Sequence, residues 1–460
     1  MKQPLPLGLR LMLLLLAIIF AVCVAYVLYN ADKYLFDLKR WLMLTGGIVL
    51  GMAALGLAYR WRAFATYLVL TSISALVAIY GAEFVLTIKQ TAPALGSPGP
   101  FSATLAADMI RAAEAKGERL RPLRNYKATV VVDADGNHRS RIQIRQQELM
   151  KLGGPSKAHA LFRDLVAQEW IIVETDRYGH INDDDIWQQG SIDVLIVGAS
   201  NTKGVGAQPG KDFVSLIKAE NRSVARLALG GVGPLAKLGM VREFGPLLKP
   251  RIVFWIYADH NDLEDDLKRE LKTPALAKYL NAGYHQNLPV LEAELDQAVD
   301  AVVMEHLSRR ENQPKDMNLA KTGATNDWSR FAKLGRLRAR LGIVVGTPVT
   351  EAQLAAWTAT IKLAKQDIQA WGGRLVFVYL PMISTLRTGT DDDFKPYVLN
   401  VLRDLKVPLV DFTTDLAELP DPTIVYRLKD GSISGHYNEI GHRRLARILV
   451  KFLQRGPTVN

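Results

Sequence analysis

The stretch IDVLIVGASNTKG, residues 192–204, decides the fold. It begins with a short apolar run and ends in a turn bounded by Gly198 and Gly204. An apolar run of this length, followed by a glycine turn and a helical pattern, predicts a buried strand that leads directly into a helix. The polar residues of the turn, Ser200 among them, are then expected at the carboxyl end of that strand.

The same pattern recurs towards the C-terminus. Further strands are predicted in RSVARLALG, RIVFWIYA, RLVFVYLP and VPLVDF (residues 222–230, 251–258, 374–381 and 407–412), and helices in residues 234–249 and 350–372. Apolar strands separated by helices indicate a parallel sheet that is buried on both faces. The predicted fold class is therefore α/β, a doubly wound parallel sheet flanked by helices.

Three apolar runs precede this domain. Residues 11–29 and 41–59 carry no charge, and residues 66–88 carry only Glu83. Each run is close to the ~20 residues that cross the hydrocarbon core as a helix. A cleaved signal peptide is the alternative for the first run, but two further spans follow it without a clear cleavage site. We predict a three-helix transmembrane anchor in residues 1–90, with the Glu83 carboxylate reaching the membrane interface.

The basic residues around these runs favour one orientation. With the N-terminus in the cytoplasm, four of them lie inside and three outside, namely Lys2, Arg10, Arg60 and Arg62 against Lys33, Lys39 and Arg40. The excess agrees in direction with the positive-inside rule. The expected location is the inner (cytoplasmic) membrane, multi-pass, with the C-terminal domain on the periplasmic or extracellular side.

The remaining chain divides by composition. Residues 91–190 begin with a linker rich in Pro, Gly and Ser, followed by a small α+β preface with a charged helical pattern over residues 106–124. Residues 191–460 form the α/β domain, with a helical insertion at about 264–346. Between Arg309 and Arg340 nine Lys/Arg stand against three acids, which indicates either a solvated helical face or a polyanion-binding patch.

Composition excludes several classes of protein. The 57 Lys+Arg and 46 Asp+Glu give a net charge of +11, which fits nucleic acid, an anionic membrane or an acidic polymer without separating them. Cys23 is the single cysteine, so an intramolecular disulfide framework and a Cys-rich zinc site are excluded. The sequence shows no nucleic-acid-binding module, no phosphate-loop spacing and no HExxH pattern, so no nucleic acid, metal or other cofactor is implied. No protein partner is indicated.

The residues after the predicted strands are those of an acyl-transfer site. In an open α/β sheet, ligands bind beyond the carboxyl ends of the strands. Ser200 follows the first strand and Asn261 the third, while His436 precedes the last predicted helix. A serine needs a base to become a nucleophile, and His436 is the candidate base. The backbone N–H groups of Ser200 and Gly231, with the Asn261 amide, are the candidate oxyanion-hole donors.

These segments together resemble the SGNH (GDSL-like) hydrolase family, in particular its membrane-anchored bacterial members. The matching segments are residues 198–204 (GASNTKG), 231–235 (GVGPL), 261–263 (NDL) and 436–441 (HYNEIG), with TDRYGHIN at 175–182 ahead of the serine strand. The resemblance runs from about Thr175 to the C-terminus. It implies a serine esterase or acyltransferase acting on an O-acyl ester of an envelope glycan or lipid.

Three positions depart from the family pattern. Ala199 stands where the family has Asp beside the nucleophile, and His260 stands where it has Gly before the catalytic Asn. The acid expected three residues before His436 is replaced by Ile433. Either Asp430 supplies that carboxylate from a longer loop, or Ser200 and His436 act as a dyad with a less well oriented base.

Two functions from different classes remain open at this stage. The first is a membrane-anchored serine esterase or acyltransferase in which Ser200 attacks and His436 takes the proton. The second is a degenerate domain that binds an envelope polymer or a protein. A hydrogen bond between the His436 ring and the Ser200 hydroxyl, with Asn261 facing the same cleft, would favour the enzyme.

Overall fold

The computed structural model describes residues 5–29, 38–91, 103–123, 129–164, 169–220, 222–259, 261–311, 349–388, 394–428 and 431–455, with residues 331, 334 and 337. The chain forms two compact units. The first comprises Met1–Ser97 and Pro314–Pro348, and the second Pro98–Gln313 and Val349–Asn460. Part of the predicted insertion thus belongs with the N-terminal helices.

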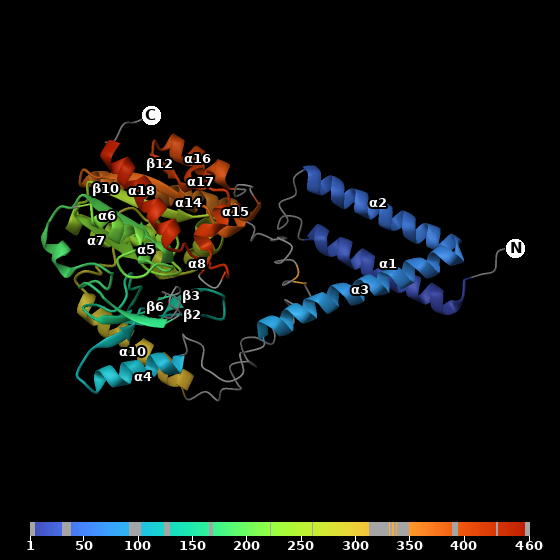
Figure 1. Cartoon of the computed structure of the whole chain (residues 1–460), viewed down its shortest axis with the longest axis horizontal. Coiled ribbons are helices and arrows are strands. Elements are labelled where there is room, and N and C mark those ends of the chain that lie inside the picture. Colours follow the sequence, from blue (N-terminus) through green and yellow to red (C-terminus); the bar gives the residue numbers. More distant parts are fainter. Residues whose placement is uncertain are drawn as a thin grey trace. The chain divides into compact units, whose positions relative to one another are not determined.

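Three long helices make up most of the first unit: α1 (Leu7–Tyr29), α2 (Leu38–Arg60) and α3 (Arg62–Thr91) (Figure 1). Two stretches, Leu7–Tyr26 and Arg62–Leu86, are long and apolar enough to cross a membrane, whereas the apolar part of α2, Leu44–Arg60, is shorter. The prediction of three helices is confirmed. Two of them have the length and apolar character of a membrane span, and the three-span anchor stays a prediction.

Glu83 lies on α3, and the sequence predicts that its carboxylate reaches the membrane interface. Its side chain is fully buried, and its carboxylate accepts a hydrogen bond of 2.6 Å from the backbone N–H of Leu337. Nearby, the rings of Tyr80 and Phe331 lie 5.6 Å apart. Residues near Leu337, far away in the sequence, therefore contact α3 and provide a hydrogen-bond donor for the only acidic side chain of this helix.

The second unit contains a five-stranded parallel sheet, as predicted. Its strands are β8 (Val194–Gly198), β9 (Val224–Ala228), β10 (Ile252–Ala258), β11 (Arg374–Leu380) and β12 (Leu409–Asp411). Their order across the sheet is β12-β11-β10-β8-β9, and every neighbouring pair is parallel. From β8 the chain goes first to β9 on one side and then to β10 on the other, which makes the carboxyl ends of β8 and β10 the topological switch point.

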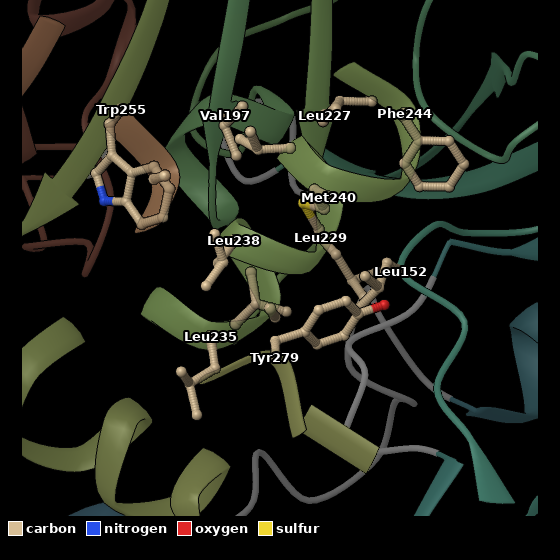
Figure 2. Packing of buried hydrophobic residues seen from close by; sticks show 14 of the residues in the cluster. Leu152, Val197, Leu227, Leu229, Leu235, Leu238, Met240, Phe244, Trp255 and Tyr279 are labelled. Carbon is tan, nitrogen blue, oxygen red and sulfur yellow. The ribbon is translucent and has the colours of Figure 1, made fainter. Parts of the chain in front are cut away.

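Both faces of the sheet are covered, which explains why the strands are apolar throughout. Alternate side chains point to opposite faces. Leu195, Val197 and Trp255 join one core with α7 (Pro234–Leu248) and α14 (Glu351–Ala370). Ile196 and Phe254 join the other with α6 (Phe213–Lys218) and α18 (Glu439–Arg455). Figure 2 shows part of the first core, in which Val197 and Leu227 share one apolar cluster with Leu238, Met240 and Phe244 of α7.

The preface is an α+β segment, but its helix is shorter than predicted. Helix α4 (Ala103–Glu114) ends well before Arg124 because β1 (Leu120–Pro122) pairs in parallel with β6 (His159–Asp164), which pairs antiparallel with β7 (Glu169–Glu174). Two short hairpins follow β1, one formed by β2 (Val130–Val132) and β3 (His138–Ser140), the other by β4 (Ile142–Ile144) and β5 (Gln147–Leu149).

Residues 175–182, which precede β8, connect the preface to the sheet through hydrogen bonds. Asn182 accepts a hydrogen bond from the Arg226 N–H at 2.8 Å and donates one to the Arg226 carbonyl at 2.9 Å, so its side chain acts as an extra strand partner for β9. Asp176 is fully buried and accepts hydrogen bonds from the backbone N–H groups of Tyr178 and His180. This is a structural role for the motif at residues 175–182.

The second unit also contains other helices and helical turns. They are η3 (Asp184–Gln188), α5 (Ser200–Lys203), η4 (Asp262–Asp266), α8 (Leu267–Leu271), α9 (Pro274–Ala277), η5 (Lys278–Leu280), α10 (Glu292–Glu311), α15 (Ile383–Thr388), α16 (Lys395–Asp404), α17 (Phe412–Leu416) and η6 (Pro422–Tyr426).

Candidate active site

Ser200 begins the short helix α5, immediately after β8 and Ala199. The turn is tight on its strand side, because a Cβ added to Gly198 would lie 2.0 Å from the Thr202 hydroxyl oxygen. At the other end Gly204 has a φ of 97°, a left-handed conformation that favours glycine. Both glycines of the motif are therefore required by the backbone that presents the serine.

A cavity of about 220 Å³ opens beside Ser200 at the carboxyl ends of β8 and β10. It is lined by Ala199, Ser200, Asn201, Lys237, Ile256, Ala258, Asn261, Leu380, Met382, Gly435 and His436. The cavity thus brings together three of the predicted site residues, Ser200, Asn261 and His436. Of these, Ser200 and His436 are more than 200 residues apart in the sequence. Gly231, which is also among the described residues, does not line the cavity.

The loop that carries His436 is fastened to the serine turn. The Asn201 side-chain oxygen accepts a hydrogen bond of 3.3 Å from the Tyr437 N–H. Tyr437 is fully buried, and its hydroxyl donates to the Pro381 carbonyl at 2.6 Å. A Cβ on Gly206 would lie 2.0 Å from the Tyr437 carbonyl oxygen, so the two loops are in direct contact.

Asn438, within this motif, and His442, directly after it, have packing roles. The Asn438 side chain accepts hydrogen bonds from the Ile440 and Gly441 N–H groups at the start of α18, at 2.9 and 3.2 Å. His442 is fully buried, with one ring nitrogen 3.3 Å from the Phe213 N–H and the other 3.2 Å from the Val205 carbonyl. With both nitrogens engaged, His442 is not available as a second base.

His436 is a neutral base at pH 7. Burial, together with smaller contributions from nearby His442 and Lys203, lowers the pKa of His436 from its ordinary 6.5 to about 4. In the described part of the chain, no hydrogen bond joins the His436 ring to the Ser200 hydroxyl or to a carboxylate. Asp430 and His260 lie outside the described residues, so neither the candidate triad acid nor the histidine before Asn261 is placed.

Asn261 follows β10 and faces the cavity. One of its two amide N–H groups donates to the Asp266 carboxylate at 2.8 Å. An amide nitrogen carries two donors, so the second N–H remains for a ligand in the cavity. This arrangement suits the predicted oxyanion role.

Lys237 also lines the cavity, and the sequence analysis missed it. It lies on α7 and is 1% exposed, with its ammonium donating to the Ile256 carbonyl at 2.9 Å and forming an ion pair with Asp262. Burial raises the pKa of Asp262 to about 6, against the opposing effect of Lys237. The available signal was a lone lysine in the apolar run PLAKLGMV, where a solvated cation is not expected.

Part of the cavity wall is apolar. Ile256, Leu380 and Met382 form this part. Buried Asp259 holds this wall in place by accepting hydrogen bonds from the Met382 N–H and from the Thr385 hydroxyl, the latter at 2.6 Å. The cavity therefore combines a hydroxyl, a neutral imidazole and an amide with a surface that suits hydrocarbon.

No protein-family model matches the chain, and no curated protein matches it. Among solved structures, a lipase/acylhydrolase from Enterococcus faecalis overlaps 58% of this chain and 99% of its own, at 11% identity and a TM-score of 0.32. An acetyl xylan esterase from the rumen bacterium Butyrivibrio proteoclasticus overlaps 63% of this chain and 66% of its own, at 10% identity and a TM-score of 0.28. Because these TM-scores are low, the overlaps carry no argument about function, and the site has to be judged on its own geometry.

Proposed function

We propose that this chain is a membrane-anchored serine esterase that cleaves or transfers an O-acyl ester. The single observation that carries the proposal is the cavity shared by Ser200, Asn261 and His436 at the switch point of the sheet. A hydroxyl, a neutral imidazole and an amide donor are the groups that nucleophilic acyl transfer requires.

In the proposed mechanism the Ser200 oxygen attacks the ester carbonyl carbon while His436 takes the hydroxyl proton. The carbonyl oxygen becomes an oxyanion, which accepts hydrogen bonds from the backbone N–H groups of Ser200 and Gly231 and from the Asn261 amide. The C–O bond to the leaving alcohol then breaks, and His436 returns the proton to that alcohol. Water or a sugar hydroxyl resolves the acyl-enzyme by the same steps in reverse.

The proposed substrate is an acylated glycan or lipid of the cell envelope. The apolar wall formed by Ile256, Leu380 and Met382 suits the hydrocarbon part of an acyl group. The N-terminal helices would hold the enzyme at the inner membrane, with the second unit on the periplasmic or extracellular side. Transfer to water and transfer to another alcohol share one covalent intermediate, so the same residues serve both.

The test is labelling of the full-length protein in detergent with a fluorophosphonate probe, which reacts with activated serines. We expect labelling of the wild type, loss of labelling in Ser200→Ala, and unchanged labelling in the matched control Ser191→Ala, which alters an exposed serine. The melting temperature of Ser200→Ala should stay within a degree or two of wild type, because the hydroxyl makes no described hydrogen bond.

The second candidate function is a binding module without catalysis. It is favoured by the absence of a hydrogen bond between Ser200 and His436 in the described structure and by Ala199 and Ile433 at family-pattern positions. A folded wild type that the probe does not label would support the binding module, and pull-downs with envelope polymers would then replace enzyme assays.

A further inference from the structure

One short segment after β10 forms hydrogen bonds with Asn261 and with the loop of Gly231, which carry two of the predicted oxyanion donors. It comprises η4 and α8, Asp262–Leu271, and it starts directly after Asn261. Asp266, Arg269 and Glu270 project from it at helical spacings of three and four residues, so they share one face. Asp266 is 3% exposed and Glu270 fully buried, so these side chains are part of the interior.

Asp266 holds the Asn261 amide. Its Oδ2 accepts the 2.8 Å hydrogen bond from Asn261 Nδ2, while its backbone N–H donates to the Asn261 carbonyl at 2.9 Å. Both the backbone and the side chain of Asn261 are thereby tied to Asp266. With one amide hydrogen taken by the carboxylate, the direction of the other is determined by the plane of the amide.

Arg269 connects this carboxylate to the glycine loop. Its Nη2 contacts Asp266 Oδ1 and also donates to the Gly231 carbonyl at 2.7 Å. Gly231 has a φ of 77°, in the left-handed region that favours glycine. A glycine has no Cβ, so its backbone can adopt more conformations than that of other residues. A charged donor on its carbonyl restricts that choice and orients the adjoining peptide units.

The loop at residues 231–235 also packs closely against Asp266 and Glu270. A Cβ on Gly233 would lie 2.7 Å from the Asp266 Cβ and 2.9 Å from a Glu270 carboxylate oxygen. Glu270 accepts hydrogen bonds from the Gly233 and Leu235 N–H groups at 2.6 and 2.8 Å, and so caps the start of α7. The glycine loop therefore cannot move away from α8 without breaking three hydrogen bonds, of which the one from Arg269 is charge-assisted.

We propose that Asp266 and Arg269 are positioning residues that link the Asn261 amide to the Gly231 peptide and align both for the same oxyanion. This inference rests on the proposed esterase function. Oxyanion donors act mainly in the transition state, so misalignment lowers kcat more than it changes KM. Asn261 lines the cavity, whereas Asp266, Arg269 and Gly231 do not. Asp266 and Arg269 therefore act through the Asn261 amide and through the orientation of the Gly231 peptide.

The experiment compares Arg269→Met with wild type in the full-length protein, using hydrolysis of p-nitrophenyl acetate. Rates are expressed per active site titrated with the fluorophosphonate probe, so that unfolded protein does not count. We expect kcat to fall on the order of tenfold to hundredfold, with KM changed less than about threefold. Arg269→Lys, which keeps a cation but has no planar fork to bridge two acceptors, should be intermediate. It also replaces the Met variant if that one does not fold.

The control is Arg251→Met, which removes an arginine that is 79% exposed at the opposite end of β10 and should leave kcat unchanged. A double-mutant cycle with Asn261→Ala then separates positioning from stability. Alone, Asn261→Ala should cost roughly a hundredfold to a thousandfold in kcat. In the Arg269→Met background it should cost clearly less, because the amide is already misaligned.

Each outcome decides the inference. A kcat within about twofold of wild type for Arg269→Met, or losses that multiply independently in the cycle, would overturn the positioning role and leave the esterase intact. A wild type with neither labelling nor turnover would instead contradict the proposed function, and the positioning role would fall with it. A lower melting temperature at unchanged kcat per titrated site would assign Arg269 to stability alone.

Discussion

At the scale of single residues, His436 decides how well the proposed site can work. Among the described residues, the titratable groups that influence His436 are His442 and Lys203, and both lower its pKa. A histidine beside a carboxylate has the opposite environment, with a raised pKa and a ring held in one tautomer. The site therefore offers a base that is always deprotonated at pH 7 but is weaker than a histidine of a Ser-His-Asp triad.

The pH profile of kcat/KM tests this description. Since the neutral imidazole is the active form, activity should rise as the pH increases through the His436 pKa, with a midpoint near 4, below the ordinary value of 6.5, and stay level to pH 8. Asp430→Asn should leave this midpoint unchanged. A midpoint at or above 6.5 that falls in Asp430→Asn would show instead that Asp430 is the triad acid.

At the scale of elements, the site depends on how the start of α18 is fastened. Asn438 caps this helix with its side-chain oxygen and donates its amide to the Ile424 and Arg427 carbonyls at 2.7 and 2.8 Å. Its own N–H donates to the Val425 carbonyl at 2.7 Å. One residue thus joins α18 to η6, two positions after His436, and limits the movement of the base.

We expect Asn438→Ala to reduce both stability and activity. Loss of the cap and of two buried amide hydrogen bonds should lower the free energy of unfolding by about 2–4 kcal/mol, measured by chemical denaturation. Turnover per titrated site should also fall, because the His436 loop loses its anchor. Asn400→Ala, which removes an exposed asparagine on α16, is the matched control and should change neither quantity. Normal turnover in a destabilised Asn438→Ala protein would mean that Tyr437 and Asn201 hold the loop unaided.

At the scale of the whole molecule, α2 would determine, in the proposed membrane anchor, on which side of the membrane the second unit lies. Three crossings from a cytoplasmic N-terminus place it outside, and two crossings return it to the cytoplasm. Helix α2 has 23 residues, about 35 Å at 1.5 Å per residue, although its apolar part Leu44–Arg60 is shorter than those of α1 and α3. Its length is therefore sufficient, and its composition is the weak point of the three-span prediction.

Fusions to alkaline phosphatase, which is active only outside the cytoplasm, test the crossings. We expect a fusion after Asn460 to be active and a fusion after Arg60 to be inactive, because an even number of crossings precedes Arg60 and an odd number precedes the C-terminus. The reverse pattern would show that α2 does not cross. The full chain should also remain in the membrane fraction after an alkaline carbonate wash, whereas a peripheral protein would be released.

The sequence by itself determined the features that depend on local pattern. Apolar runs of strand length identified all five strands of the sheet, and turn residues at their carboxyl ends identified Ser200 and Asn261. Because parallel strands place those ends along one edge, the shared cavity with His436 also followed. The early end of α4 was missed because β1 is selected by pairing with β6, some 40 residues further along the chain.

Only the tertiary structure decided which charges meet. Three contacts join segments that share no pattern in the sequence. They are the ion pair of Lys237 with Asp262, the hydrogen bond from Arg269 to Gly231 and the hydrogen bond from Leu337 to Glu83. The pKa of His436 likewise depends on burial and on His442 and Lys203, which folding brings near it. Electrostatic energies depend on distance and on local dielectric, and neither is a property of sequence spacing. The sequence thus supplied the proposed reacting groups, and the packing of distant segments determined how they are oriented.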